Sequence, residues 1–319
     1  MDTRTDVGRP PTRGGTGVGP AAIEVEALTK VFGKNVAVDA IDLRVEPGQV
    51  FGYLGPNGAG KTTTIRVLAG LLRPTSGSAR VLGRDVVRER DLMQRSMGYL
   101  PGDFVAYPDL TAEEYLRFLA RLRPHVDWAL VRELCGRLDL DLDRRVSAMS
   151  HGNRQKIGIV QALMHRPELV ILDEPTSGLD PIVQREFLEI LREVRGEGRT
   201  VFLSSHVLSE VEAIADTVAI LRRGRLVVVE SVERLKAKSR RRLDLTFRDD
   251  VPTDLLAAVP EVRDVLVSGP TARVTVEGST AALLEAAAPH HVERIVTHEA
   301  DLEEIFLGYY QEDGQEDGS

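Results

Sequence analysis

Eight residues from Gly55 to Thr62, reading Gly-Pro-Asn-Gly-Ala-Gly-Lys-Thr, have the types and spacing needed to hold a polyphosphate. Glycines allow a wrapped backbone whose N–H groups point inward, and the helix predicted next adds its own unpaired N–H groups. Lys61 can reach the β and γ phosphates, and the Thr62 hydroxyl can hold Mg²⁺. We expect the nucleotide to contact Gly55, Pro56, Asn57, Gly58, Ala59, Gly60, Lys61, Thr62 and Thr63.

A second candidate site lies where the apolar run Leu169–Leu172 ends in Asp173 and Glu174. Such a run is typical of a buried parallel strand, and carboxylates at the edge of a core are costly unless a cation compensates them. Asp173 suits the hydration shell of Mg²⁺, and Glu174 suits polarising an attacking water. A strand that simply enters a polar loop would look the same, but the phosphate loop upstream favours the catalytic interpretation.

A third candidate is the start of a predicted helix at Ser150-His151-Gly152-Asn153. Ser150 is a good N-cap, and Gly152 is a position where backbone can approach a ligand. Together they would form an anion site at a helix start. Taken alone, this stretch is a weak signal, and an ordinary capped helix is the default interpretation.

The composition restricts the class of protein. The net charge of −8, from 41 basic and 49 acidic residues, argues against a nucleic-acid partner. The single cysteine, Cys135, excludes an internal disulfide, fits a reducing cytosol and falls in an apolar helical pattern typical of a core. No run approaches the roughly 18 apolar residues that span a membrane. Residues 1–21 and 311–319 have the composition of disordered tails rather than of a signal peptide or a folded segment.

The elements that must position these residues follow from hydrophobic periodicity. We expect strands within 23–45 and a mostly helical stretch over 111–148 that begins with a Thr111–Glu114 capping box. A helix over 183–194 and the strands 200–203, 218–221 and 226–229 complete a unit near residue 233. A basic run over 236–242 then marks a junction with a solvated surface.

Beyond the junction we predict a small α+β domain over 240–310. Its pattern resembles a split βαβ unit. The expected order is strand 242–247, helix 253–258, strands 262–268 and 271–276, helix 280–288, strand 291–297 and helix 300–309.

Residues 22–233 resemble the nucleotide-binding subunit of an ATP-binding cassette (ABC) transporter. Its motifs occur here in the family's order: the phosphate loop, Ser150-His151-Gly152-Asn153, Asp173-Glu174, Ser177-Gly178-Leu179-Asp180, and His206. The whole chain, through Leu302–Leu307, is most similar to ABC-2 type exporter subunits, including antibiotic-resistance ones. The resemblance implies an α/β P-loop NTPase of the ABC type, with a mixed sheet core, an antiparallel β subdomain and a helical subdomain.

The resemblance also implies roles that spacing does not show. Phe32 would stack on adenine, although a packed strand phenylalanine is nearly as good an interpretation. Ser150, Gly152 and Asn153 would contact the γ phosphate of ATP held by a second copy of the subunit. Asp180 would lie at that shared face, and His206 would contact the γ phosphate and align Glu174 with water.

The sequence departs from the family's pattern where a glutamine usually contacts Mg²⁺. Gly102 and Asp103 occupy that place, and we hypothesise that the Asp103 carboxylate substitutes as a metal ligand. The stretch opening at Ser150 also differs, with Met149, His151 and Asn153 where Leu, Gly and Gln are usual.

The leading functional hypothesis is an ATPase, using ATP and Mg²⁺, that powers a separate membrane permease at the cytoplasmic face of the cell membrane. The expected cargo class is drugs, antibiotics or lipids, and the expected docking region is 107–148. The alternatives are a soluble cassette ATPase and a regulatory nucleotide-binding module without turnover. Glu174 and His206 favour turnover, whereas the missing glutamine keeps the regulatory module open.

Overall fold

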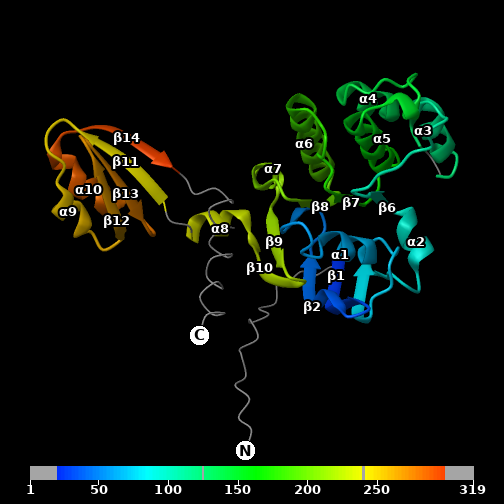
Figure 1. The fold of residues 1–319 in the computed structure, drawn as a ribbon, viewed down its shortest axis with the longest axis horizontal. Helices are drawn as coiled ribbons and strands as arrows, with labels where there is room; N and C mark the ends of the chain where they lie inside the picture. Colours follow the sequence, from blue (N-terminus) through cyan, green and yellow to red (C-terminus); the bar gives the residue numbers. More distant parts are fainter. Residues whose placement is uncertain (1–19, 124–125, 239–240, 299–319) are drawn as a thin grey trace, which may run out of the picture.

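The computed structural model describes residues 20–123, 126–238 and 241–298, and its larger unit is built on a six-stranded sheet (Figure 1). The strand order is β10-β9-β3-β8-β7-β6, and only the β10–β9 pair is antiparallel. Helices and a second sheet cover both faces, so β3 and β7 are buried at every residue. The strands are β3 (Val50–Leu54), β6 (Met97–Leu100), β7 (Leu169–Asp173), β8 (Thr200–Ser205), β9 (Thr217–Arg222) and β10 (Arg225–Ser231).

A four-stranded antiparallel sheet, in the order β2-β1-β4-β5, packs with helix α1 (Lys61–Leu68) against one face of the core sheet. Alternate residues of β3 and β8, including Phe51, Tyr53 and Phe202, contribute to this core because successive strand residues face opposite sides. The strands are β1 (Ile23–Phe32), β2 (Asn35–Val45), β4 (Ser76–Val81) and β5 (Arg84–Asp85), and helix α2 (Arg90–Arg95) follows them.

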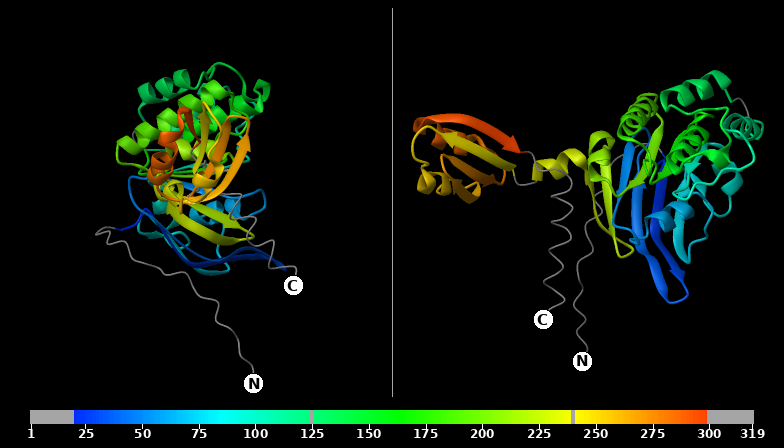
Figure 2. Two further views of the ribbon diagram at one scale, coloured as in Figure 1. Left: turned by 90° about the vertical axis from the view of Figure 1, so that its left-hand side faces the viewer. Right: turned by 45° about the horizontal axis from the view of Figure 1, so that its top comes forward.

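The opposite face of the core sheet carries the larger helices, and Figures 1 and 2 show them (green) on the side away from the antiparallel sheet (blue). Helix α3 begins at the predicted capping box, in which Thr111 and Glu114 each bond the other's backbone N–H. The helices are α3 (Ala112–Ala120), α4 (Trp128–Arg137), η1 (Val146–Ala148), α5 (His151–Leu163), α6 (Pro181–Gly196), α7 (Leu208–Ile214) and α8 (Val232–Lys238).

Beyond α8 lies a smaller unit with its own hydrophobic core, drawn from residues 243–292 (Figure 2). Its antiparallel sheet has the order β12-β13-β11-β14, with two helices packed on it, which is the split βαβ arrangement that the sequence predicts. The elements are β11 (Arg241–Phe247), α9 (Thr253–Ala257), β12 (Val262–Ser268), β13 (Thr271–Val276), α10 (Ala281–Ala287), η2 (Ala288–His290) and β14 (Val292–His298).

Some expectations differ from the structure. Ala21, placed in the N-terminal tail, is buried, because the chain joins the antiparallel sheet at the next residue, where Ala22 N–H donates to the Val45 carbonyl. Residues 138–145 form no helix, and the larger unit continues through α8 rather than ending near 233. The predicted tails over 1–19 and 311–319 and the helix over 300–309 lie outside the described residues. Within the part that the structure describes, no helix has the length and apolarity needed to cross a membrane.

Candidate active site

The phosphate loop joins β3 to α1, as predicted, and two of its glycines are required by close backbone packing. A Cβ on Gly60 would lie 2.4 Å from the Ala37 carbonyl oxygen, and one on Gly55 would lie 2.5 Å from that of Leu221. Gly60 is also the N-cap of α1, with φ of 110°, a region that L side chains rarely adopt. The first turn of α1 follows, where Thr62 is exposed and Thr63 is half-buried.

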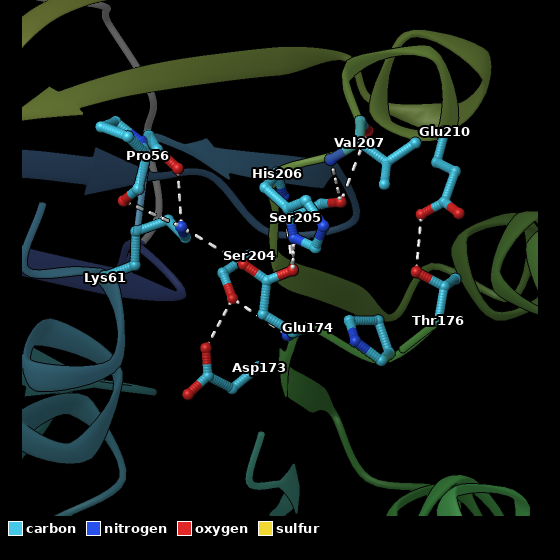
Figure 3. A network of polar contacts seen from close by, with 12 residues as sticks. Pro56, Lys61, Asp173, Glu174, Thr176, Ser204, Ser205, His206, Val207 and Glu210 are labelled. Atoms are coloured by element: carbon cyan, nitrogen blue, oxygen red, sulfur yellow. Dashed lines mark hydrogen bonds and ion pairs between the residues drawn. The ribbon is translucent and has the colours of Figure 1, made fainter. Parts of the chain in front are cut away.

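Lys61 connects the loop to the acidic end of β7 (Figure 3). Its Nζ donates to the carbonyls of Gly55 at 2.6 Å and Pro56 at 3.3 Å, and lies 3.2 Å from Glu174 Oε1. Only 6% of the side chain is exposed. The structure therefore brings the predicted phosphate-binding cation and the predicted base together.

Asp173 ends β7 directly beside Ser204 on the parallel strand β8. The Ser204 hydroxyl donates to Asp173 Oδ1 at 2.6 Å, while Oδ2 is buried and has no hydrogen-bond partner among the described residues. A buried carboxylate oxygen without a partner is costly unless a cation or a donor reaches it. Hard oxygen donors of this kind suit Mg²⁺, so the residues present fit the predicted metal.

Glu174 has a strained backbone, with φ of 49°, which is uncommon for a residue with a side chain. Its N–H donates to the Ser204 carbonyl and hydroxyl oxygens at 3.2 and 3.1 Å, which holds the turn in place. One carboxylate oxygen faces Lys61, and the other lies 2.6 Å from His206 Nδ1 and 3.3 Å from the His206 backbone N (Figure 3). The strain and the paired contacts together fix where this carboxylate points.

Ser150 caps α5 as the sequence predicts, and its hydroxyl accepts the Asn153 N–H at 3.2 Å. The reason for Gly152 is different from the one expected. A Cβ there would lie 2.1 Å from the Gly178 carbonyl oxygen. The close approach of the protein's own backbone therefore requires a glycine at this position, with or without a ligand.

Two further residues implied by the resemblance lie on exposed surfaces. Asp180 is the N-cap of α6 and accepts the N–H groups of Ile182 and Val183, each at 3.1 Å. These backbone hydrogen bonds, that of Val183 first, lower the pKa of Asp180. Phe32 ends β1 with 48% of its surface exposed, and Lys30 Nζ lies 5.0 Å from its ring centroid.

The structure does not bring Asp103 into a bond with the acidic end of β7. Its side chain is 78% exposed and lies 3.2 Å from Arg66 Nη2, on α1. Gly102, rather than Asp103, lies against the carboxylate that we predict to hold the metal, since a Cβ on Gly102 would lie 3.4 Å from Asp173 Oδ2. The notion of Asp103 as a metal ligand stays a hypothesis, and the geometry gives this carboxylate another partner.

Two residues that contact this acidic segment, Ser204 and Gln155, have no role among the predictions from the sequence. Ser204 is the penultimate residue of β8, at the end of the parallel sheet where Asp173 lies, and that position was a usable signal. Gln155 gave no such signal, because its partners, the carbonyls of Glu174 and Pro175, are distant in sequence.

Comparison with known proteins agrees with this geometry. A profile of the ABC transporter family matches residues 38–177. The bacitracin transport ATP-binding protein BcrA of Bacillus licheniformis is 38% identical over 71% of this chain and 75% of its own. The daunorubicin/doxorubicin resistance ATP-binding protein DrrA of Streptomyces peucetius is 39% identical, over 68% of this chain and 67% of its own.

A solved structure described as an ATP-binding subunit of an ABC transporter aligns with a TM-score of 0.62 and 30% identity. It covers 67% of this chain and 92% of that one. The residues matched by the family profile include the phosphate loop and the acidic end of β7. The chain therefore belongs to the ABC transporter family and is one of its ATP-binding ATPase subunits.

Proposed function

We propose that this chain hydrolyses ATP with Mg²⁺ between two copies of itself and thereby drives a separate membrane permease that exports drugs, antibiotics or lipids. The observation that carries the proposal is the cluster in which Glu174 lies between Lys61 and His206. The relatives named for bacitracin transport and daunorubicin resistance support the class of cargo.

The proposed reaction uses groups that are already in position. Lys61 and the loop N–H groups hold the β and γ phosphates, and Glu174 orients a water whose oxygen attacks the γ phosphorus. The bond to the β–γ bridging oxygen breaks, and Glu174 accepts the water's proton. Thr62 and Asp173 would hold Mg²⁺, which supplies charge neutralisation when bound. His206 keeps the Glu174 carboxylate aligned, so most of the catalysis is positioning.

Closure of two copies is supported by the exposed start of α5. Ser150 is exposed, and the first turn of a helix carries N–H groups that have no partner within the helix, which favours an anion there. Asp180, exposed at the start of α6, lies in the segment that follows Glu174. In the proposal these residues face the second copy, and Phe32 stacks on adenine.

Docking to a permease at the cytoplasmic face of the membrane is supported by exposed apolar side chains within the expected region 107–148 and just before it. Tyr107 packs edge-on against Phe118, with ring centroids 6.0 Å apart. Apolar side chains left in water over a continuous area mark interaction sites. The exposed fractions are 80% for Val105, 57% for Tyr107, 43% for Phe118 and 67% for Leu122.

A test of turnover compares the purified chain with Glu174→Gln. We expect kcat to fall by about 10²–10⁴-fold, the range typical of losing a general base, while ATP binding is retained. Glu189→Gln, which removes an exposed carboxylate on α6 paired with Arg192, is the matched control and should keep kcat. A parent chain that binds ATP yet hydrolyses it no faster than Glu174→Gln would instead support the regulatory module.

A further inference from the structure

A buried glutamine on α5 reaches across to the turn that carries the catalytic carboxylate. Gln155 is 1% exposed, and its Nε2 lies 3.1 Å from the Pro175 carbonyl and 3.3 Å from that of Glu174. Its Oε1 is buried without a hydrogen-bond partner anywhere in the described ranges. The amide NH₂ group therefore donates to two adjacent carbonyls, whereas the amide oxygen has no partner among the described residues.

The turn that receives these bonds is held from other sides as well. Ser204 on β8 binds the Glu174 N–H, and the Thr176 hydroxyl donates to Glu210 Oε2 on α7 at 2.7 Å (Figure 3). Glu210 is 9% exposed, and burial raises its pKa. A positive φ at Glu174 persists only when its surroundings over-determine it. Gln155 adds side-chain hydrogen bonds to this turn from α5.

A space-filling role alone does not account for a glutamine here. A buried amide oxygen without a partner destabilises the folded chain, and an apolar side chain of the same shape would avoid that cost. Locally unfavourable choices are expected where a residue serves the site. What the glutamine adds over such a side chain is the pair of bonds to the catalytic turn.

The position of Gln155 along α5 gives these bonds a further consequence. The same helix begins at the Ser150 cap, and the Gly152 backbone packs directly against Gly178 in the segment after Glu174. A rigid helix moves as a unit, so a shift at Ser150 carries the Gln155 amide with it. The direction in which the Glu174 carboxylate points then depends on the position of α5, the helix whose start faces the second copy in the proposed function.

We propose that Gln155 is a positioning residue that makes the orientation of Glu174 depend on the contact of α5 with the nucleotide held by the second copy. This inference rests on the proposed function, because it requires two copies to share their nucleotides. In each chain, Gln155 would then connect two sites. One is the nucleotide of the second copy, which the start of α5 contacts, and the other is the chain's own nucleotide, on which Glu174 acts.

The direct test is Gln155→Met, which keeps the length and burial of the side chain and removes its donor. The matched control is Gln161→Met, the same substitution on the same helix, where the lost bond joins Tyr115 instead of the catalytic turn. We expect Gln155→Met to lower kcat at least tenfold with less than a twofold change in ATP Kd. Gln161→Met should keep kcat within twofold.

A kcat within twofold of the parent for Gln155→Met, or equal losses in both variants, would overturn the inference. If the parent itself shows no ATPase activity, the proposed function fails instead, so the two failures are distinguishable.

A second readout separates positioning from stability. The effect of Gln155→Met on kcat is measured again in a Ser150→Ala background. If α5 transmits the contact, Gln155→Met should lower kcat much less in the Ser150→Ala background than in the parent chain. The reason is that Ser150→Ala already removes most of the contact that α5 would transmit. Multiplicative, independent losses would contradict the connection between the two sites.

Discussion

At the scale of single residues, the chemistry depends on a carboxylate whose two oxygens have different partners. Glu174 faces Lys61 with one oxygen and His206 with the other, while its backbone is held by Ser204. Preorganised contacts of this kind require no rearrangement when charge develops in the reaction. At this scale the chemistry of Glu174 depends on how its neighbours position it.

The role of Asp103 is testable at the same scale. Its pair with Arg66 is exposed, and such pairs contribute about 0–1 kcal/mol. We expect Asp103→Ala to keep ATPase activity and its Mg²⁺ requirement within twofold, as measured by Mg²⁺ titration, whereas Asp173→Ala should abolish activity. A tenfold loss for Asp103→Ala, with a raised Mg²⁺ requirement, would instead support Asp103 as a metal ligand.

At the scale of elements, the close packing of α5 on the segment after β7 makes Gly152 intolerant of substitution. Gly152→Ala places a methyl group 2.1 Å from the Gly178 carbonyl, and overpacking of this kind costs about 1–3 kcal/mol. We expect a lower unfolding midpoint in denaturant and a loss of ATPase activity. Gly136→Ala is the control, since a Cβ there meets nothing within 4 Å. Equal effects for both substitutions would contradict the packing argument.

The connection between α5 and β7 contains a pH-sensitive residue. Burial, with help from the charge of Arg123, lowers the pKa of His165 to about 4. The unfolded chain therefore takes up this proton near pH 6.5 and the folded chain only near pH 4. Stability should fall over that interval, by at most about 3 kcal/mol from this group.

His165→Gln tests this interval, because glutamine can still donate to the Met97 carbonyl that His165 Nε2 contacts but does not titrate. Denaturant unfolding of the variant should show a flatter decline between pH 6.5 and 4 than the parent. An unchanged decline would assign the acid sensitivity to other groups.

Periodicity and capping were enough to predict most elements. The alternating run over 242–247 matches β11, and the Thr111–Glu114 pair marks the start of α3, because both signals are local. The phosphate loop and Asp173-Glu174 were recognisable for the same reason. The bonds from Gln155 and the reason for Gly152 were not predictable, because they depend on which distant segments the fold brings together.

At the scale of the whole molecule, the described residues form two units whose buried cores share no residues. One set of clusters lies within residues 23–235 and the other within 243–292. A chain ending at Lys238 keeps α8, whose Val232 and Leu235 belong to the larger core. We expect it to fold, with ATPase activity within twofold and a thermal midpoint within a few degrees of the full chain. Aggregation or loss of ATP binding on truncation would contradict this independence.

The measurement that tests the central claim most directly is sedimentation velocity of Glu174→Gln with ATP and Mg²⁺. The account predicts a shift from one copy to two with ATP, no shift with ADP, and none when Ser150→Ala is added. A protein that binds ATP yet sediments as a single copy at saturating nucleotide would contradict closure of two copies over shared phosphates.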